Sequence, residues 1–118
     1  MARTPEGEIK FAICQYLATV HRDVIFWLNA SVGRSGRKNH SKYQRNGTAD
    51  ILGILPGGRM LAIEVKTLEG KLTAEQRDFL SLVNKMGGVA GLCRSVGEVQ
   101  LLMQEADLNY EDEHGEDN

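Results

Sequence analysis

The chain has 118 residues, of which 42% are hydrophobic and 25% charged, and its formal net charge is −2. This composition is typical of one globular domain with a single core, and no apolar run approaches the roughly 18 residues that a membrane span needs. The polar stretch from Met1 to Lys10 contains no apolar segment of a secretory signal. We therefore expect a cytoplasmic protein, and neither a membrane-bound nor a secreted one.

Helical and strand-like patterns alternate along the sequence. Thr4-Pro5 is a typical helix start, Pro56-Gly57-Gly58 a typical hairpin turn, and Thr73 to Gln76 fits a capping box. The predicted elements are, in chain order, a helix over 5–21, a strand over 24–28, a long polar loop over 30–47, strands over 50–55 and 60–66, a helix from 74 to the glycines at 87–88, a strand over 89–93 and a helix from 96 to about 104. Because the last strand follows a helical crossover, we expect a mixed sheet flanked by helices.

The net charge conceals two segments of opposite sign. Seven acidic residues and no Lys or Arg fall in the last fourteen positions (Glu105, Asp107, Glu111, Asp112, Glu113, Glu116, Asp117). We therefore predict a folded domain over residues 1–104 and an acidic, flexible tail over 105–118. No acid occurs between Val24 and Ala49, where bases accumulate instead (Arg34, Arg37, Lys38, Lys42, Arg45). This basic loop suits contact with phosphates, although a merely solvated loop explains it equally well.

Three charged residues are expected to converge in the predicted hairpin. Glu64 and Lys66 face the same side of their strand, which by itself most often indicates an ordinary ion pair. An antiparallel turn centred near residue 57 places Asp50 opposite Glu64. Two carboxylates at close range repel unless a cation lies between them, and a few hard oxygen ligands favour Mg²⁺ or Mn²⁺. With Lys66 able to orient a water or accept its proton, the set predicts metal-assisted phosphodiester hydrolysis.

The same residues resemble a known signature. Asp50, thirteen intervening residues and Glu64-Val65-Lys66 resemble the Asp…Glu-x-Lys pattern of the PD-(D/E)XK nuclease superfamily. The ordered set resembles its VRR-NUC branch, the virus-type replication-repair nucleases, over about residues 6–100 (Glu8, Gly47-x-x-Asp50, Glu64-x-Lys66, Gly70-Lys71-Leu72-Thr73, Gln76). One departure is Ala49, which stands where the superfamily name has a proline.

The resemblance implies an α/β fold with the restriction-endonuclease-like αβββαβ core and a Mg²⁺- or Mn²⁺-dependent DNA endonuclease. It implies that the cation is held by two carboxylates and one carbonyl, with a third acid from the first helix (Asp50, Glu64, the Val65 carbonyl, Glu8). Lys66 would act on the attacking water, and Gln76 would orient a ligand or water. Each assignment has a simpler alternative: Glu8 suits the first turn of any helix, Gln76 suits a capping box, and a lone Asp beside Thr and Gly suits a strand start.

The resemblance also bears on substrate and assembly. Standalone members of this branch resemble Holliday-junction resolvases, which implies a homodimer acting on DNA, branched DNA included, in a bacterial or phage-infected cell. The expected DNA contacts are the basic loop and its aromatic residue (Arg34, Arg37, Lys38, Lys42, Tyr43, Arg45). Trp27 lies in an apolar strand and is expected in the core, with stacking on a base as the alternative. The terminal helix (Val99, Leu102, Met103) is expected to pack in the core, with a dimer contact as the alternative. The other open functions are a non-catalytic nucleic-acid-binding module and a nuclease subunit of a larger replication, repair or restriction assembly.

Overall fold

The computed structural model describes residues 3–29, 42–43 and 45–114. Within these ranges, three helices and four strands follow one another as α1 (Pro5–Val20), β1 (Ile25–Leu28), β2 (Ile51–Ile54), β3 (Met60–Val65), α2 (Ala74–Lys85), β4 (Val89–Cys93) and α3 (Val96–His114). This confirms the predicted order of elements. Within the described ranges, none of the helices is long and apolar enough to cross a membrane.

The four strands form one mixed sheet in the order β1-β2-β3-β4. The β1–β2 and β2–β3 pairs are antiparallel, while β4 runs parallel to β3, as a strand that follows a helical crossover should. Ile51 pairs with Ile63 across the hairpin. One step further along the same register, Asp50 lies opposite Glu64, as predicted.

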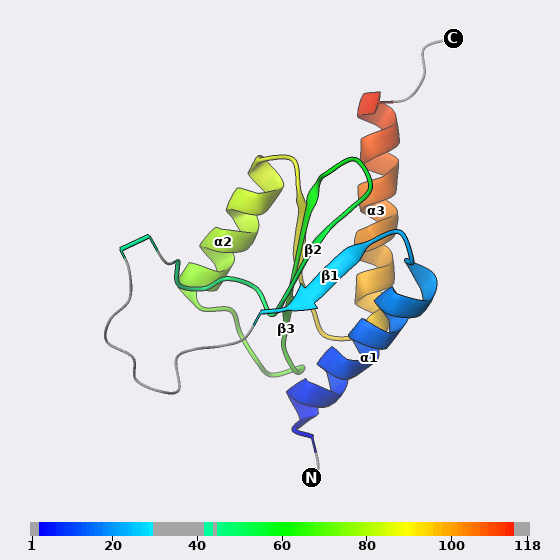
Figure 1. Cartoon of the computed structure of the whole chain (residues 1–118). Helices are drawn as coiled ribbons and strands as arrows, with labels where there is room; N and C mark the ends of the chain where they lie inside the picture. The colour runs from blue at the N-terminus through cyan, green and yellow to red at the C-terminus, as the bar shows by residue number, and fades with distance from the viewer. Residues whose placement is uncertain (1–2, 30–41, 44, 115–118) are drawn as a thin grey trace.

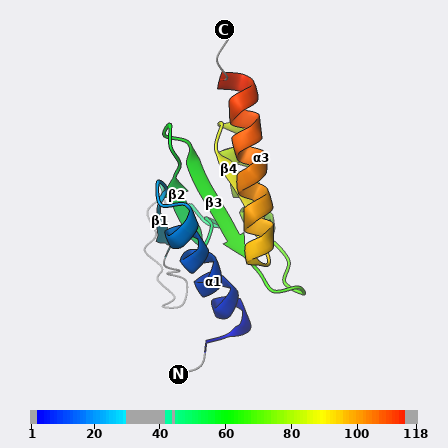
Figure 2. The same cartoon turned by 90° about the vertical axis from the view of Figure 1, so that its right-hand side faces the viewer.

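Helices cover both faces of the sheet, with α1 and α3 on one face and α2 on the other (Figures 1 and 2). Alternate residues of β3 supply both cores: one half packs with α1 and α3, and the other half packs under α2. The first core contains Leu61, Ile63, Val65, Ile13, Leu17, Val99 and Met103. The second contains Ala62, Ala90, Phe79, Leu80 and Val83. The terminal helix therefore packs in the core through Val99 and Met103.

Two helix starts are built as the sequence predicts. The Thr4 hydroxyl accepts the Gly7 backbone N–H at 3.0 Å, with Pro5 in the first turn of α1. At α2, the Thr73 hydroxyl accepts the Gln76 N–H at 3.1 Å while the side-chain carbonyl oxygen of Gln76 accepts the Thr73 N–H at 2.9 Å. This reciprocal capping box fixes the rotamer of Gln76 as well as the start of the helix.

The predicted end of the last helix was wrong. The expected end is near Gln104, but α3 continues to His114 and so includes most of the acidic segment. Ala106 is 6% exposed and belongs to the core shared with α1. No Gly or Pro interrupts the chain between Gly97 and Gly115, and each added residue of a started helix gains a hydrogen bond.

The expected burial of Trp27 was also wrong. Its side chain is 45% exposed, and Ile25 and Leu28 of the same strand are 63% and 55% exposed. The cause is topological, because β1 is an edge strand whereas α2 packs over β3 and β4. An apolar strand is buried only where other elements cover both of its faces.

Candidate active site

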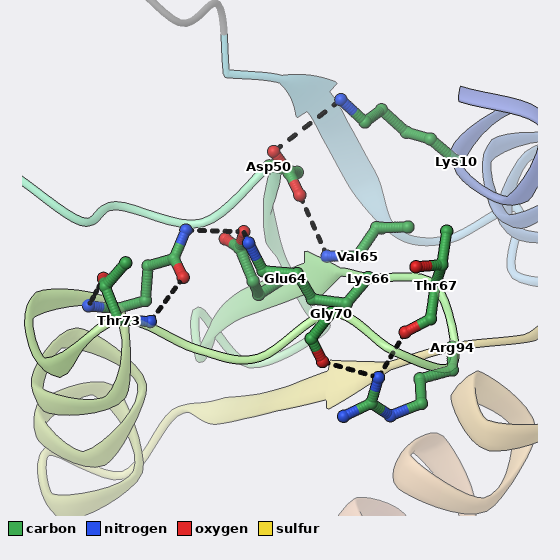
Figure 3. Close-up of polar contacts among 10 residues, drawn as sticks. Lys10, Asp50, Glu64, Val65, Lys66, Thr67, Gly70, Thr73 and Arg94 are labelled. Carbon is green, nitrogen blue, oxygen red and sulfur yellow. Dashed lines mark hydrogen bonds and ion pairs between the residues drawn. The ribbon is translucent and has the colours of Figure 1, made fainter. Parts of the chain in front are cut away.

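The candidate site lies where β2 begins and β3 ends, beside the first turn of α2 (Figure 3). Asp50 immediately precedes β2, Glu64 is the penultimate residue of β3, and Lys66 follows that strand. Gln76 approaches from α2 on the face that Glu64 occupies. The structure therefore brings together four of the five predicted catalytic residues.

Asp50 is held by contacts from three elements. Its Oδ2 accepts the Val65 backbone N–H at 2.9 Å, and its Oδ1 lies 3.7 Å from the Lys10 Nζ of α1. Its carbonyl oxygen accepts the Asn29 N–H at 2.8 Å, which extends the β1–β2 pairing by one residue. Since 21% of the Asp50 side chain is exposed, the carboxylate is fixed in place and still open to a ligand.

Glu64 is a buried carboxylate with two unequal oxygens. The side chain is 3% exposed. Oε2 accepts the Gln76 Nε2–H at 2.9 Å and lies 3.8 Å from the Lys66 Nζ. Oε1 is buried and has no hydrogen-bond partner among the described residues. A buried acceptor without a donor is costly, so this oxygen marks a position where a ligand would be stabilising.

The surroundings of Glu64 oppose its ionisation. Burial, and after it the negative charge of Asp50, raises the pKa of Glu64 from 4.5 to about 7, while the Lys66 ammonium opposes the shift. A proton or a metal cation at this carboxylate relieves the same repulsion. The electrostatics therefore favour cation binding, and they make it dependent on pH near neutrality.

Gln76 makes two side-chain contacts, one with the start of its own helix and one with Glu64. Its amide oxygen closes the capping box with the Thr73 N–H, which leaves the amide nitrogen facing Glu64. Because the amide oxygen accepts the Thr73 N–H, the amide nitrogen is the end that meets the Glu64 carboxylate. The opposite orientation would place the amide oxygen against another acceptor. The helix start and the orientation of Glu64 are therefore coupled through one side chain.

Lys66 is positioned by a loop and by an arginine that the sequence analysis does not identify. The aliphatic part of Lys66 lies against Gly70, where an added Cβ would stand 3.2 Å from the Lys66 Cβ and Cδ. The Arg94 Nη1 donates to the carbonyl oxygens of Thr67 and Gly70, the latter at 2.8 Å (Figure 3). The turn that confines the lysine is thus pinned to the end of β4. The only signal in the sequence is that Arg94 directly follows an apolar strand.

Glu8 is not brought to the carboxylate pair. Its carboxylate lies 3.4 Å from the Arg3 guanidinium, and 58% of the side chain is exposed. Across the described ranges, no group of three or more His, Cys, Asp or Glu side chains is placed to hold a metal ion. Lys10 occupies the α1 position beside Asp50 instead. Because successive helix residues are rotated by about 100°, positions 8 and 10 point about 160° apart, and α1 directs only one of them to the site.

The predicted DNA contacts fall only partly within the described residues. Lys42, Tyr43 and Arg45 are exposed, with the Lys42 Nζ 5.2 Å from the centroid of the Tyr43 ring. Arg34, Arg37 and Lys38 lie outside the described ranges. The loop rejoins the fold at Gly47, where φ is +81° and an added Cβ would lie 2.5 Å from the Glu75 carbonyl carbon. This close contact with the first turn of α2 fixes the path that leads into Asp50.

A separate cavity of about 510 Å³ lies at the opposite end of α2. It is lined by the hairpin turn, by apolar residues of α2 that include Phe79 and Met86, and by Arg45, one of the predicted DNA contacts. It contains none of the predicted catalytic residues. The carboxylate site, in contrast, is built from charged side chains, among them Asp50, Glu64 and Lys66.

Comparison with known proteins agrees with this architecture. The VRR-NUC domain family model matches residues 23–97, which is more than half of the chain. A solved structure described as a VRR-NUC domain is 21% identical, with a TM-score of 0.62 over 86% of this chain and 97% of that chain. At that identity the likeness shows the fold alone, and it confirms the predicted PD-(D/E)XK-like core. A comparison with curated proteins found no match.

Proposed function

The chain belongs to the VRR-NUC family and carries a nuclease-type domain, and from this premise we propose that it is a divalent-metal-dependent endonuclease that hydrolyses phosphodiester bonds of DNA. The observation that carries the proposal is the buried Glu64 carboxylate, whose Oε1 has no partner in the described part of the chain and whose neighbour is a second carboxylate. An ordinary ion pair on a strand would have neither a buried carboxylate oxygen without a partner nor a second carboxylate beside it.

The donor set fits Mg²⁺ or Mn²⁺. Asp50 and Glu64 would hold the ion, and the Val65 carbonyl is the third proposed ligand; both ions prefer such oxygen ligands. When bound, the ion would neutralise charge on the phosphate and lower the pKa of a bound water. The proposed role of Glu8 would require its carboxylate to leave Arg3 and the first turn of α1 to rotate, since Lys10 now faces Asp50.

Three side chains around the carboxylates have further proposed roles in catalysis and in phosphate binding. Lys66, 18% exposed and confined by Gly70, holds its ammonium at the Glu64 oxygen, where it would orient the attacking water and offset phosphate charge. Gln76 restrains Glu64 through the same oxygen, so that Oε1 stays directed at the ligand position. Lys10 places a second ammonium beside Asp50 that is suited to a phosphate oxygen.

We further propose that the enzyme acts on branched DNA as a homodimer. The described part of one chain contains one carboxylate site, whereas cutting two symmetric strands of a junction requires two sites related by a two-fold axis. The basic loop would grip backbone phosphates beside each site (Arg34, Arg37, Lys38, Lys42, Tyr43, Arg45). Replacing Arg34, Arg37 and Lys38 together with alanine should weaken binding and flatten its salt dependence, and an unchanged salt slope would remove this loop from the interface.

The deciding experiment is cleavage of labelled four-way junction, splayed-arm and linear duplex DNA with Mg²⁺, Mn²⁺ or EDTA. Glu64→Ala and Asp50→Ala should abolish cleavage while leaving the chain folded, because removing one clustered acid relieves repulsion. Glu69→Ala is the matched control, since it removes an exposed acid from the loop after β3. Symmetric cuts confined to the junction would support the dimer.

A second readout separates metal binding from chemistry. Calorimetric titration with Mn²⁺ should show binding to the wild type and to Lys66→Ala, but not to Glu64→Ala. DNA binding without cleavage under every metal condition would contradict the proposal. It would favour a non-catalytic nucleic-acid-binding module or a subunit that needs a partner.

A further inference from the structure

Trp27 is the single tryptophan of the chain, and it is neither buried nor part of the site described above. It lies on the edge strand β1 with 45% of its side chain exposed. A large aromatic side chain exposed on an edge strand loses hydrophobic stabilisation and invites unwanted association. An exposed indole therefore raises the question of what contacts it.

The sheet register places Trp27 beside Asp50. Trp27 pairs with Leu52, which packs on the α2 side of the sheet, so the indole is on the same face as Glu64. Asp50 is two residues before Leu52, and the Asn29 N–H bond to its carbonyl continues the pairing to that point. Diagonal cross-strand neighbours of this kind are about 7–8 Å apart. Trp27 is thus a diagonal cross-strand neighbour of Asp50, one of the two carboxylates that would hold the scissile phosphate.

A nucleobase suits this position better than another protein does. The chain approaches Asp50 after the exposed Lys42, and Lys10 places an ammonium beside Asp50, which favours a polyanion at this end of the sheet. Indole rings provide flat stacking surfaces for bases, and stacking is tolerant of sequence. In a duplex both faces of an interior base are already stacked, so only an unpaired or extruded base is free to use the indole.

We propose that Trp27 is a stacking platform for an unpaired base next to the cleaved phosphate, so that the enzyme selects DNA with single-stranded or unstacked nucleotides at the cut. This inference rests on the proposed nuclease function and adds a source of structure selectivity within one protomer. Branch recognition then has two independent components: the spacing of two sites and the capture of a base at each.

The single tryptophan makes the test direct. Fluorescence of the full chain in EDTA, excited beyond the tyrosine absorption, is titrated with oligothymidylate and with a blunt duplex of equal length. Stacking should quench and shift the emission with the single strand and should leave it nearly unchanged with the duplex. Trp27→Ala should weaken single-strand binding about 5- to 150-fold, and Trp27→Phe should recover most of the loss.

Leu28→Ala is the matched control. Leu28 is the next residue on β1 and is 55% exposed, but it points to the other face of the sheet. It should leave single-strand affinity within about twofold of wild type, since no aromatic face is removed. Duplex affinity should be equal in all four proteins, and matching far-ultraviolet spectra and urea midpoints show that each variant is folded.

Three results would overturn the inference. The first is a wild type that cleaves DNA but shows unchanged fluorescence with oligothymidylate, together with full single-strand affinity in Trp27→Ala. This result would remove the stacking role and would leave the proposed nuclease function standing. Loss of dimer in sedimentation of both Ile25→Ala and Trp27→Ala would assign the exposed apolar row of β1 to contact between copies instead. Absence of both DNA binding and cleavage in the wild type would reject the proposed function and this inference together.

Discussion

Replacing Glu64 with glutamine should stabilise the protein while removing its proposed activity. The introduced side chain would keep the size of the original and an oxygen for the Gln76 amide, but it carries no charge next to Asp50. In the folded chain the pKa of Glu64 is raised from 4.5 to about 7 by burial and by the neighbouring carboxylate. This difference corresponds to up to about 3 kcal/mol of unfolding free energy.

The sign follows from which state binds the proton more tightly. Between pH 4.5 and 7 the folded chain retains a proton at Glu64 that the unfolded chain has already lost. The stabilising contribution is therefore complete below pH 4.5 and disappears as the pH rises through 7. Glu64→Gln does not titrate, so its advantage over the wild type should be small at the acidic end and largest above neutrality.

Urea unfolding in EDTA, followed by circular dichroism across this pH range, measures the difference directly. Glu69→Gln controls for loss of an exposed acid and should differ little from wild type at any pH. A Glu64→Gln variant that is less stable than wild type above pH 7, or equally more stable at every pH, would refute the electrostatic account. Added Mn²⁺ should raise the stability of the wild type only, because the variant lacks one ligand charge.

Three further results are expected from the same geometry. Gly47→Ala should lower the free energy of unfolding by more than about 1 kcal/mol in urea titrations, because of its positive φ and the nearby Glu75 backbone. Gly70→Ala should displace the Lys66 side chain and lower kcat severalfold with little change in KM or stability, whereas an effect on KM alone would argue against a role in the chemical step. Cation binding should release protons and weaken as the pH falls through 7, which calorimetry in buffers of different ionisation enthalpy can detect; proton-independent binding would mean that the ion does not compete at Glu64.

The hairpin could be predicted from sequence because its geometry is local. The Pro-Gly-Gly turn sets the register, and the two-residue period of a strand then decides which side chains share a face. Asp50, Glu64 and Lys66 are brought together by these two rules alone. The double role of Gln76 is local as well, since the capping box fixes its amide before any tertiary contact is considered.

The exposure of Trp27 and the contact of Arg94 with the lysine loop depend on tertiary neighbours. Nothing in the sequence of β1 says that it lies at an edge of the sheet, and nothing in the residues around Arg94 names the Thr67 and Gly70 carbonyls. Both features belong to the ends of elements, where side chains meet partners from other parts of the chain. Functional contacts concentrate at such ends, which is why sequence patterns detect them least well.

The first helix shows where sequence reasoning about charge reaches its limit. Its apolar stripe consists of the buried Ile13 and Leu17 and the partly buried Ile9, with Glu8 and Ala12 on one flank and Lys10 and Cys14 on the other. The family resemblance implies that Glu8 completes a cluster of three carboxylates, whereas the residues alone equally suit an acid in the first turn of a helix. The rotation of α1 on the sheet decides otherwise and gives Asp50 an ammonium neighbour. The described site thus contains two carboxylates and two ammonium groups that contact one another. This arrangement suits the joint binding of a cation, which would contact the carboxylates, and a phosphate, which would contact the ammonium groups.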